Sequence, residues 1–197
     1  YRSSLTRTSP RLCWKDRRIA ENPVAHLSVV KPDKDRRHLR WELFPEELEK
    51  LIKSTHSAPV IRGLSGPDRA MLYLTAAYTD LCASELAALT PACFTFDSDP
   101  PCVTVDARTA HNREQDVLPL RSDVSVMLRR WLKGKPLDCR LWPGKWALHN
   151  AAGKLLRRDL NTAGIPYVNA SGRYADFHAL RHTFISGLAR TGAHPKV

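Results

Sequence analysis

The segment from Asp176 to Gly192 is the part of this sequence that most restricts how the chain can fold. Asp176 is a candidate N-cap, Gly192 and Pro195 are stop signals, and the apolar residues between them recur at helical spacing, namely Phe177, Leu180, Phe184 and Leu188. His178 and Arg181 are three residues apart, so they lie on one side of the helix near its start. Unpaired backbone N–H groups and the helix dipole favour phosphate there. Arginine can hold two phosphate oxygens, and histidine can move a proton near neutral pH.

This pattern has plainer interpretations as well. A histidine and an arginine at this spacing are often no more than a solvated helix surface. His178 and His182, four residues apart, could chelate a metal ion, but no third cysteine or acidic ligand is evident nearby. We therefore expect no metal site, and the residues alone leave phosphate binding and simple solvent exposure both open.

The remainder of the chain predicts helices with one short β segment among them. Helices are expected from Pro45 to Ile52, from Pro67 onward, from Ser84 to Leu89, after a Ser122 cap, and from Leu148 to Leu160. Two runs with β-branched residues, Cys102–Val105 and Asp116–Leu120, flank a polar centre and predict a hairpin. The fold class that follows is α+β, mainly α, with a small antiparallel β insert.

The charge balance favours a polyanionic partner. The net charge is +11 with a sequence pI near 9.8, which indicates either nucleic acid or an anionic membrane surface. Residues 1–41 carry eleven Lys or Arg and only four Asp or Glu, although a solvated tail would have the same composition. No apolar run approaches the roughly 20 residues that span a bilayer, so we expect no membrane partner.

Proline positions and charged stretches indicate where domains begin and end. Residues 11–27 resemble the end of a helix that is broken at Asn22-Pro23, and residues 28–40 are a basic linker with a charged, proline-containing stretch. A new domain is expected from Trp41 to residue 197. The first residue is Tyr1 rather than methionine, so we expect the true N-terminus to lie further upstream. Five scattered cysteines form no C-x-x-C pair, which suits a reducing cytoplasm.

Three segments, in order, resemble the conserved boxes of tyrosine recombinases of the phage-integrase type. Phe177–Phe184, with the sequence FHALRHTF, is similar to the H-x-x-R box of that family. Tyr78–Leu89 is similar to the first box, usually T-G-L-R-x-S-E-L, and Val103–Leu120 is similar to the hairpin that carries a catalytic lysine. The resemblance covers nearly the whole chain, and it implies that residues 1–27 are the end of an N-terminal core-binding domain that clamps DNA.

The resemblance implies a reaction as well as a fold. In this family a tyrosine hydroxyl attacks a DNA phosphodiester and forms a 3′-phosphotyrosine, and the freed 5′-hydroxyl later attacks a partner strand, without ATP, metal or other cofactor. His178 and Arg181 would be catalytic and would hold the charge of the transition state. The expected partner is double-stranded DNA, with self-association into a synaptic tetramer if the protein is complete. The expected setting is the cytoplasm, at the nucleoid, during integration or excision of a mobile element.

Several positions depart from the family pattern. The first-box arginine falls on Cys82, which offers no positive charge, and the glycine before it is Asp80. The hairpin lysine aligns with His111, an imperfect proton donor because of its lower pKa. Glu85 matches the acidic residue of the first box and is expected to support the catalytic site. The linker and hairpin residues expected to contact DNA are Arg36, Arg37, Arg40, Arg108, Asn112 and Arg113.

The expected nucleophile has no counterpart in this sequence. In the family it lies a few tens of residues beyond the H-x-x-R box, whereas Tyr167 and Tyr174 precede that box. The catalytic domain is therefore expected to be incomplete at its C-terminus. Three interpretations stay open: a genuine recombinase with unusual catalytic residues, a decayed mobile-element remnant that still binds DNA, and a basic helical regulator without chemistry.

Overall fold

A central helix with other helices packed around it forms the body of the protein. The computed structural model describes residues 39–110 and 113–190. The predicted segment 11–27, most of the linker, His111, Asn112 and the Gly192–Pro195 stop signals lie outside these residues. The helices are α2 (Pro45–His56), α3 (Gly66–Tyr78), α4 (Ala83–Leu86), α5 (Ser122–Leu132), α6 (Ala151–Thr162) and α7 (Ala179–Arg190), with a 3-10 turn, η1, at Pro91–Cys93.

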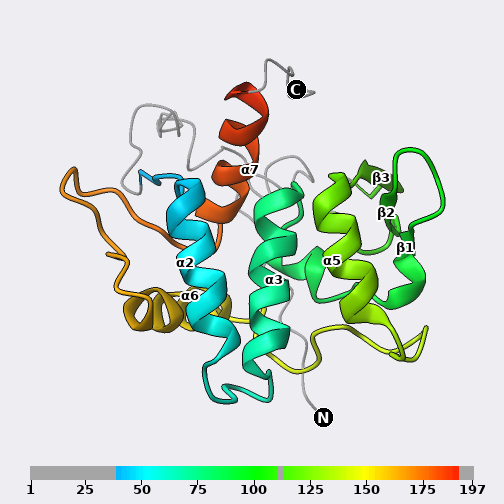
Figure 1. The fold of residues 1–197 in the computed structure, drawn as a ribbon, viewed down its shortest axis with the longest axis horizontal. Helices are drawn as coiled ribbons and strands as arrows, with labels where there is room; N and C mark the ends of the chain where they lie inside the picture. The colour runs from blue at the N-terminus through cyan, green and yellow to red at the C-terminus, as the bar shows by residue number, and fades with distance from the viewer. Residues whose placement is uncertain (1–38, 111–112, 191–197) are drawn as a thin grey trace, which may run out of the picture. The chain divides into compact units, whose positions relative to one another are not determined.

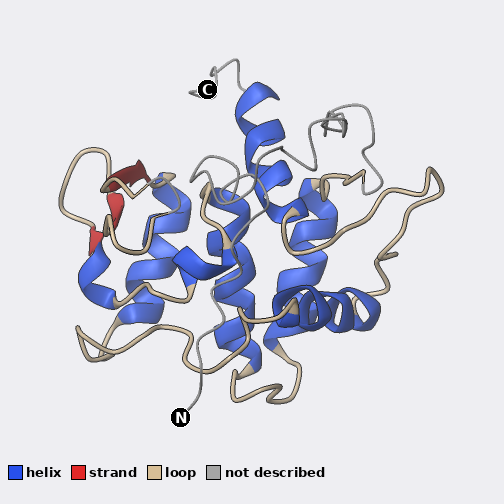
Figure 2. Ribbon diagram, turned by 180° about the vertical axis from the view of Figure 1, so that it is seen from behind, coloured by secondary structure: helices blue, strands red, loops and turns tan. Residues whose placement is uncertain are grey.

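The strands form one small antiparallel sheet at an edge of the helical body (Figures 1 and 2). The order is β1 (Phe94–Thr95), β2 (Cys102–Val105) and β3 (Asp116–Pro119). Val103 pairs with Phe94 on one side and Leu118 on the other, so β2 is the central strand. The predicted hairpin is confirmed as β2–β3, and the mainly α class of α+β fold is confirmed with it. The short strand β1 was not expected.

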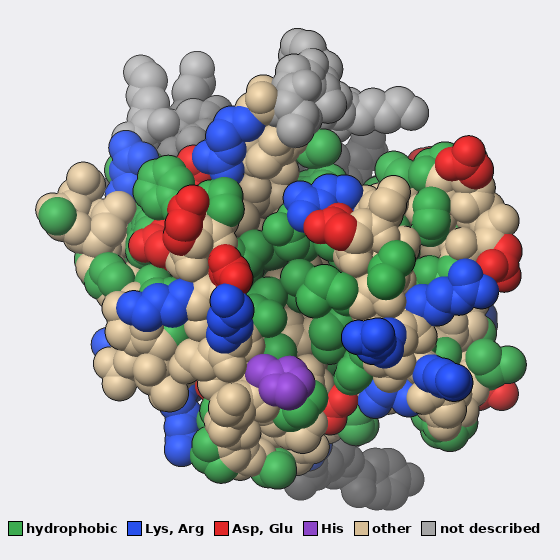
Figure 3. Space-filling model, in the orientation of Figure 1, with side chains coloured by type: hydrophobic (Ala, Val, Ile, Leu, Met, Phe, Trp, Pro, Cys, Tyr) green, Lys and Arg blue, Asp and Glu red, His purple; other side chains and the backbone are tan. Residues whose placement is uncertain are grey.

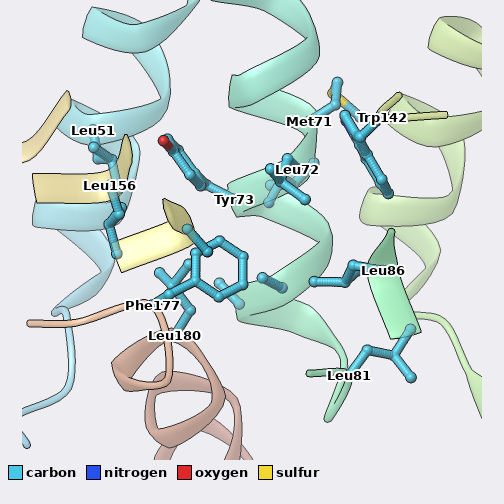
Figure 4. Close-up of a cluster of buried hydrophobic side chains, with 14 of the residues drawn as sticks. Leu51, Met71, Leu72, Tyr73, Leu81, Leu86, Trp142, Leu156, Phe177 and Leu180 are labelled. Carbon is cyan, nitrogen blue, oxygen red and sulfur yellow. The ribbon is translucent and has the colours of Figure 1, made fainter. Parts of the chain in front are cut away.

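Helix α3 is the centre of the hydrophobic core. Its residues from Arg69 to Ala77 are all buried, because α2, α5 and α7 pack against it from different sides. Helix α6 runs across α2 (Figure 1). Figure 4 shows side chains from several helices meeting around α3, and there the Phe177 ring lies 6.4 Å from the Tyr73 ring, centroid to centroid. The apolar residues just ahead of α7 therefore fix that helix on the core.

One glycine permits the tight turn between α2 and α3. A Cβ atom at Gly66 would lie 2.5 Å from the carbonyl oxygen of Ala58 and 2.6 Å from those of His56 and Thr55. No side chain fits at such distances, so a glycine is needed for the end of α2 to approach the start of α3. The Ser65 hydroxyl, which accepts a hydrogen bond from the Asp68 N–H at 3.2 Å, caps α3.

Two predicted helix starts are wrong in detail. Ser122 is the first residue inside α5 rather than its cap, since the N–H of Ser125 already bonds the carbonyl of Arg121. Helix α6 begins at Ala151 rather than Leu148, because His149 and Asn150 have positive φ angles, 49° and 60°, that no α-helical residue adopts. The short third helix also ends earlier than expected, at Leu86.

A fully buried ion pair joins α3 to α6. The Nε of Arg69 lies 2.9 Å from Asp159 Oδ2, and both side chains are at most 1% exposed. The same guanidinium donates to the carbonyls of Pro59 and Leu64, each at 2.9 Å. The Tyr73 hydroxyl donates to Asp159 Oδ2 at 2.7 Å, and burial raises the pKa of this tyrosine well above its ordinary value. Each charge is therefore compensated inside the core.

The substitution Asp159→Asn is expected to destabilise the fold by about 3–5 kcal/mol, because it leaves the Arg69 charge buried without a counter-ion. The measurement is the free energy of unfolding in urea. A matched control is Asp97→Asn, which removes the carboxylate from an exposed pair with Arg129 (2.9 Å) and should cost at most about 0.5 kcal/mol. Equal losses in the two variants would contradict the special role of the buried pair.

Candidate phosphate site

Asp176 organises the start of helix α7. Its carboxylate accepts a hydrogen bond from the N–H of Ala179 at 3.1 Å, as expected of an N-cap side chain. The helix itself begins at Ala179, so Arg181 lies in its first turn and His178 lies one residue ahead of it. The His178 carbonyl still accepts a hydrogen bond from the N–H of His182 at 3.3 Å, so the helical hydrogen-bond pattern extends back to His178.

The segment that leads into the domain is bonded to the residues before α7. The Nε of Arg40 lies 2.8 Å from each carboxylate oxygen of Asp176. Backbone hydrogen bonds run from the N–H of Tyr174 to the carbonyl of Leu39 (2.8 Å) and from the N–H of Trp41 to the carbonyl of Tyr174 (3.2 Å). Arg40, predicted as a DNA contact of the linker, is thus engaged with the cap of α7.

Arg181 forms a two-point contact with Asp80. Its Nη2 donates to Asp80 Oδ2 at 2.7 Å, and its Nε lies 2.6 Å from Oδ1. The second contact is an ion pair without hydrogen-bond alignment, since Oδ1 has no hydrogen-bond partner. Partial burial raises the pKa of Asp80; the positive charge of Arg181 opposes this, and the negative charges of Glu85 and Asp116 add to it. The two boxes that are far apart in the sequence therefore meet at this pair.

A pocket of about 230 Å³ surrounds the pair. It brings together the first box, the hairpin and the start of α7, and its lining residues are Asp80, Leu81, Glu85, Val105, Ala110, Asp116, Leu118 and Arg181. Arg181 is the only cationic side chain among the described residues of this lining, and it faces three carboxylates. The pocket is consequently acidic as it stands.

His178 lies outside this lining, on the exposed side of the helix start. Its ring packs edge to face against His182 with the centroids 5.5 Å apart. Partial desolvation lowers the pKa of His178 from 6.5, and the charges of Arg40, His182 and Arg181 lower it further, while Asp176 opposes them. The imidazole is therefore mainly neutral at pH 7 and available as a proton acceptor.

Cys82 and Glu85 form the turn into α4. The N–H of Cys82 donates to Glu85 Oε2 at 2.7 Å, and its Sγ lies 3.0 Å from Ser84 Oγ. Glu85 is buried, with 8% of its surface exposed. At the position that the sequence resemblance predicts to match an arginine, this turn presents a thiol.

Of the predicted hairpin contacts, only Arg108 and Arg113 are among the described residues. Arg108 is exposed and pairs with Asp106 at 3.2 Å, which lowers the pKa of that carboxyl. Both arginines lie on the connection between β2 and β3. Arg36, Arg37, His111 and Asn112 lie outside the described residues. Within the described ranges, no group of three or more His, Cys, Asp or Glu is placed to hold a metal ion.

A basic surface on α6 was not predicted from the sequence. Lys154, Arg157 and Arg158 are exposed at helical spacing, and they line a depression of about 480 Å³ that also includes Tyr167. The guanidinium carbon of Arg157 lies 4.8 Å from the centre of the Tyr167 ring. The i, i+3, i+4 spacing of the three cations in the expected helix was the available signal.

Basic side chains elsewhere are more dispersed. On the surface shown in Figure 3 they stand in separate groups, with acidic side chains among them. No described helix has the length and apolar character needed to cross a bilayer.

No protein-family model matches the chain, and no curated protein matches it in sequence. Solved structures do match. A Tn1549 transposon integrase in complex with transposon right end DNA superposes with a TM-score of 0.65 at 16% identity, over 94% of this chain and 65% of that one. XerA recombinase gives a TM-score of 0.56 at 16% identity, over 93% and 59% of the two chains. The catalytic domain of bacteriophage HP1 integrase gives 0.54 at 17% identity, over 79% and 75%.

These likenesses define the class of fold. The protein has the tyrosine-recombinase catalytic-domain fold, as the three sequence boxes implied. The chain spans 59% of the length of the XerA recombinase chain.

The His178 ring is expected to titrate below pH 6.5, and Arg40→Gln should raise this midpoint, because Arg40 is the positive charge that lowers the pKa of His178 most strongly. NMR titration of the ring carbon-bound protons measures the pKa directly. Arg129→Gln is a suitable control, since Arg129 is not among the charges that act on His178. A midpoint that stays unchanged or falls in Arg40→Gln would contradict this electrostatic account.

Proposed function

We propose that this protein binds double-stranded DNA as the catalytic-domain portion of a site-specific tyrosine recombinase or integrase of a mobile element. The observation that carries the proposal is the placement of His178 and Arg181 at the start of α7 on this fold. A helix start that presents an arginine and a neutral histidine suits a phosphodiester, because the arginine supplies positive charge and the histidine a proton acceptor.

The neighbours in structure support DNA as the partner. The Tn1549 integrase was solved with transposon DNA, and XerH recombinase was solved bound to its difH substrate. We expect the α6 cations Lys154, Arg157 and Arg158 to contact the DNA backbone. Because none of them takes part in a described ion pair, their charges are available for phosphates. The linker and hairpin would add further DNA contacts through Arg36, Arg37, Arg108, Asn112 and Arg113. We also propose that the protein assembles into a tetramer on DNA at the nucleoid.

The proposed chemistry is strand cleavage through a phosphotyrosine. Arg181 would hold the non-bridging phosphate oxygens, and His178 would accept a proton. None of the described tyrosines lines the pocket around Arg181: Tyr73 is buried against Asp159, and Tyr167 packs against Arg157. The nucleophile of the proposed reaction would therefore come from outside the described residues.

Two features of the site weaken the proposed chemistry. Cys82 provides no charge where the family has an arginine, and removing one preorganised donor typically costs about 10²–10³ in rate. Arg181 itself is engaged by Asp80. These observations favour the second candidate function, a DNA-binding regulator or remnant of a mobile element that does not cut DNA.

DNA binding through α6 is tested with the double variant Arg157→Gln/Arg158→Gln. Each lost phosphate contact lowers the slope of log Kd against log salt by about 0.9, so the slope should fall by about two. Fluorescence anisotropy with a labelled duplex over a range of salt concentrations gives this slope.

The control Lys53→Gln/Arg129→Gln removes the same net charge from side chains that are already paired with Glu49 and Asp97. It should change the slope little. Equal effects of the two double variants would argue against an α6 contact, and affinity that is indifferent to salt in the unaltered protein would refute DNA binding altogether.

A nicked suicide duplex separates cutting from binding. We expect no covalent protein–DNA adduct on denaturing gels from this chain, because no described tyrosine lies at the Arg181 pocket. A tyrosine-linked adduct would contradict the weakened-site interpretation and establish a working recombinase. Single-strand nicks without an adduct would indicate a different cleavage chemistry and would also contradict it.

A further inference from the structure

The two-point contact between Asp80 and Arg181 has the form of a substrate contact. An arginine binds a phosphate through two adjacent N–H groups that meet two oxygens. Here Nη2 of Arg181 donates to Asp80 Oδ2 at 2.7 Å, and Nε lies 2.6 Å from Oδ1 in an ion pair. An anion from within the protein thus takes the edge of the guanidinium that a phosphate would use.

The position of Asp80 makes this contact local to the site. It follows the end of α3 at Tyr78 and precedes α4, so it sits on the same turn as Cys82, while Arg181 comes from α7. Both side chains are about one third exposed, at 36% and 37%. The pair is therefore reachable from solvent, and an incoming anion can compete for it.

The surroundings oppose a second anion. Glu85 and Asp116 line the same pocket, and their negative charges raise the pKa of Asp80. Arg181 is the only cation among the described residues that line it. Repulsion by these carboxylates weakens the binding of a phosphate to Arg181. The existing ion pair with Asp80 weakens it further, because the phosphate must compete with the Asp80 carboxylate.

We infer that Asp80 is a positioning residue that sets the anion affinity of this site: it occupies Arg181, and a phosphate binds there only by displacing the Asp80 carboxylate. This inference rests on the proposed function in one respect, since it takes Arg181 to be a phosphate ligand. It adds that the affinity of Arg181 for phosphate is held down by a residue of the protein itself. Removing that residue should increase binding, which loss of a merely structural side chain would not do.

The test is a titration of the protein with inorganic phosphate, followed by the NMR shifts of the backbone amides in the first turn of α7. Asp80→Asn removes the competing charge and should tighten phosphate binding about tenfold, as expected when a charge-assisted contact is released. Asp80→Gly, which removes the side chain, should do the same. Asp80→Glu keeps a carboxylate and should retain the weak binding of the unaltered protein.

Two further variants show whether the effect passes through Arg181. Asp116→Asn is the matched control, because it removes a carboxylate from the same pocket without freeing Arg181, and it should tighten binding by less than about threefold. Arg181→Gln in the Asp80→Asn background should abolish the gain. Equal phosphate affinity in the unaltered protein and in Asp80→Asn would overturn the inference, as would a gain that persists without Arg181.

The same variants titrated with duplex DNA keep the two proposals apart. If Asp80→Asn has no effect on phosphate affinity but the protein binds DNA with a steep salt dependence, the role of Asp80 is refuted and the proposed function stands. If Asp80→Asn gains phosphate affinity through Arg181 but no variant binds DNA, the anion site is real and the proposed function is refuted.

Discussion

The burial of α3 is the constraint on which the rest of the structure depends. A helix whose residues from Arg69 to Ala77 are all covered needs neighbours on every side, and α2, α5, α6 and α7 are arranged to provide them. The charged residue within this stretch, Arg69, is tolerated because Asp159 and two backbone carbonyls compensate its charge. Because separating the two buried charges would be costly, the pair also fixes α6 against α3.

The candidate phosphate site lies where this buried helix ends. Beyond Tyr78 the chain turns towards α4, and Asp80 reaches Arg181 at the start of α7. Because α7 is fixed on α3 by apolar contacts that include Phe177, the position of Arg181 relative to the turn is set by the core. The chemistry of the site is then decided by which side chains that turn carries, and here they are an aspartate and a cysteine.

The sequence predicted the elements better than their contacts. The proline and acidic residues that open α2, and the β-branched run of β2, are local signals that packing did not override. The start of α6 was misplaced because the positive φ angles of His149 and Asn150 leave no mark on hydrophobic periodicity. The basic surface of α6 could have been found from its spacing, since three cations of one helix face appear in the sequence.

The sequence by itself determined that this chain is mainly helical, that a hairpin interrupts the helices, and that a histidine and an arginine open the last described helix. These properties depend on neighbours within a few residues, which periodicity and capping signals report directly. Only the tertiary structure decided that Arg181 is paired with Asp80, 101 residues away in the chain. That pairing depends on how α7 packs on α3, and no local pattern contains the distance between two side chains that the core brings together.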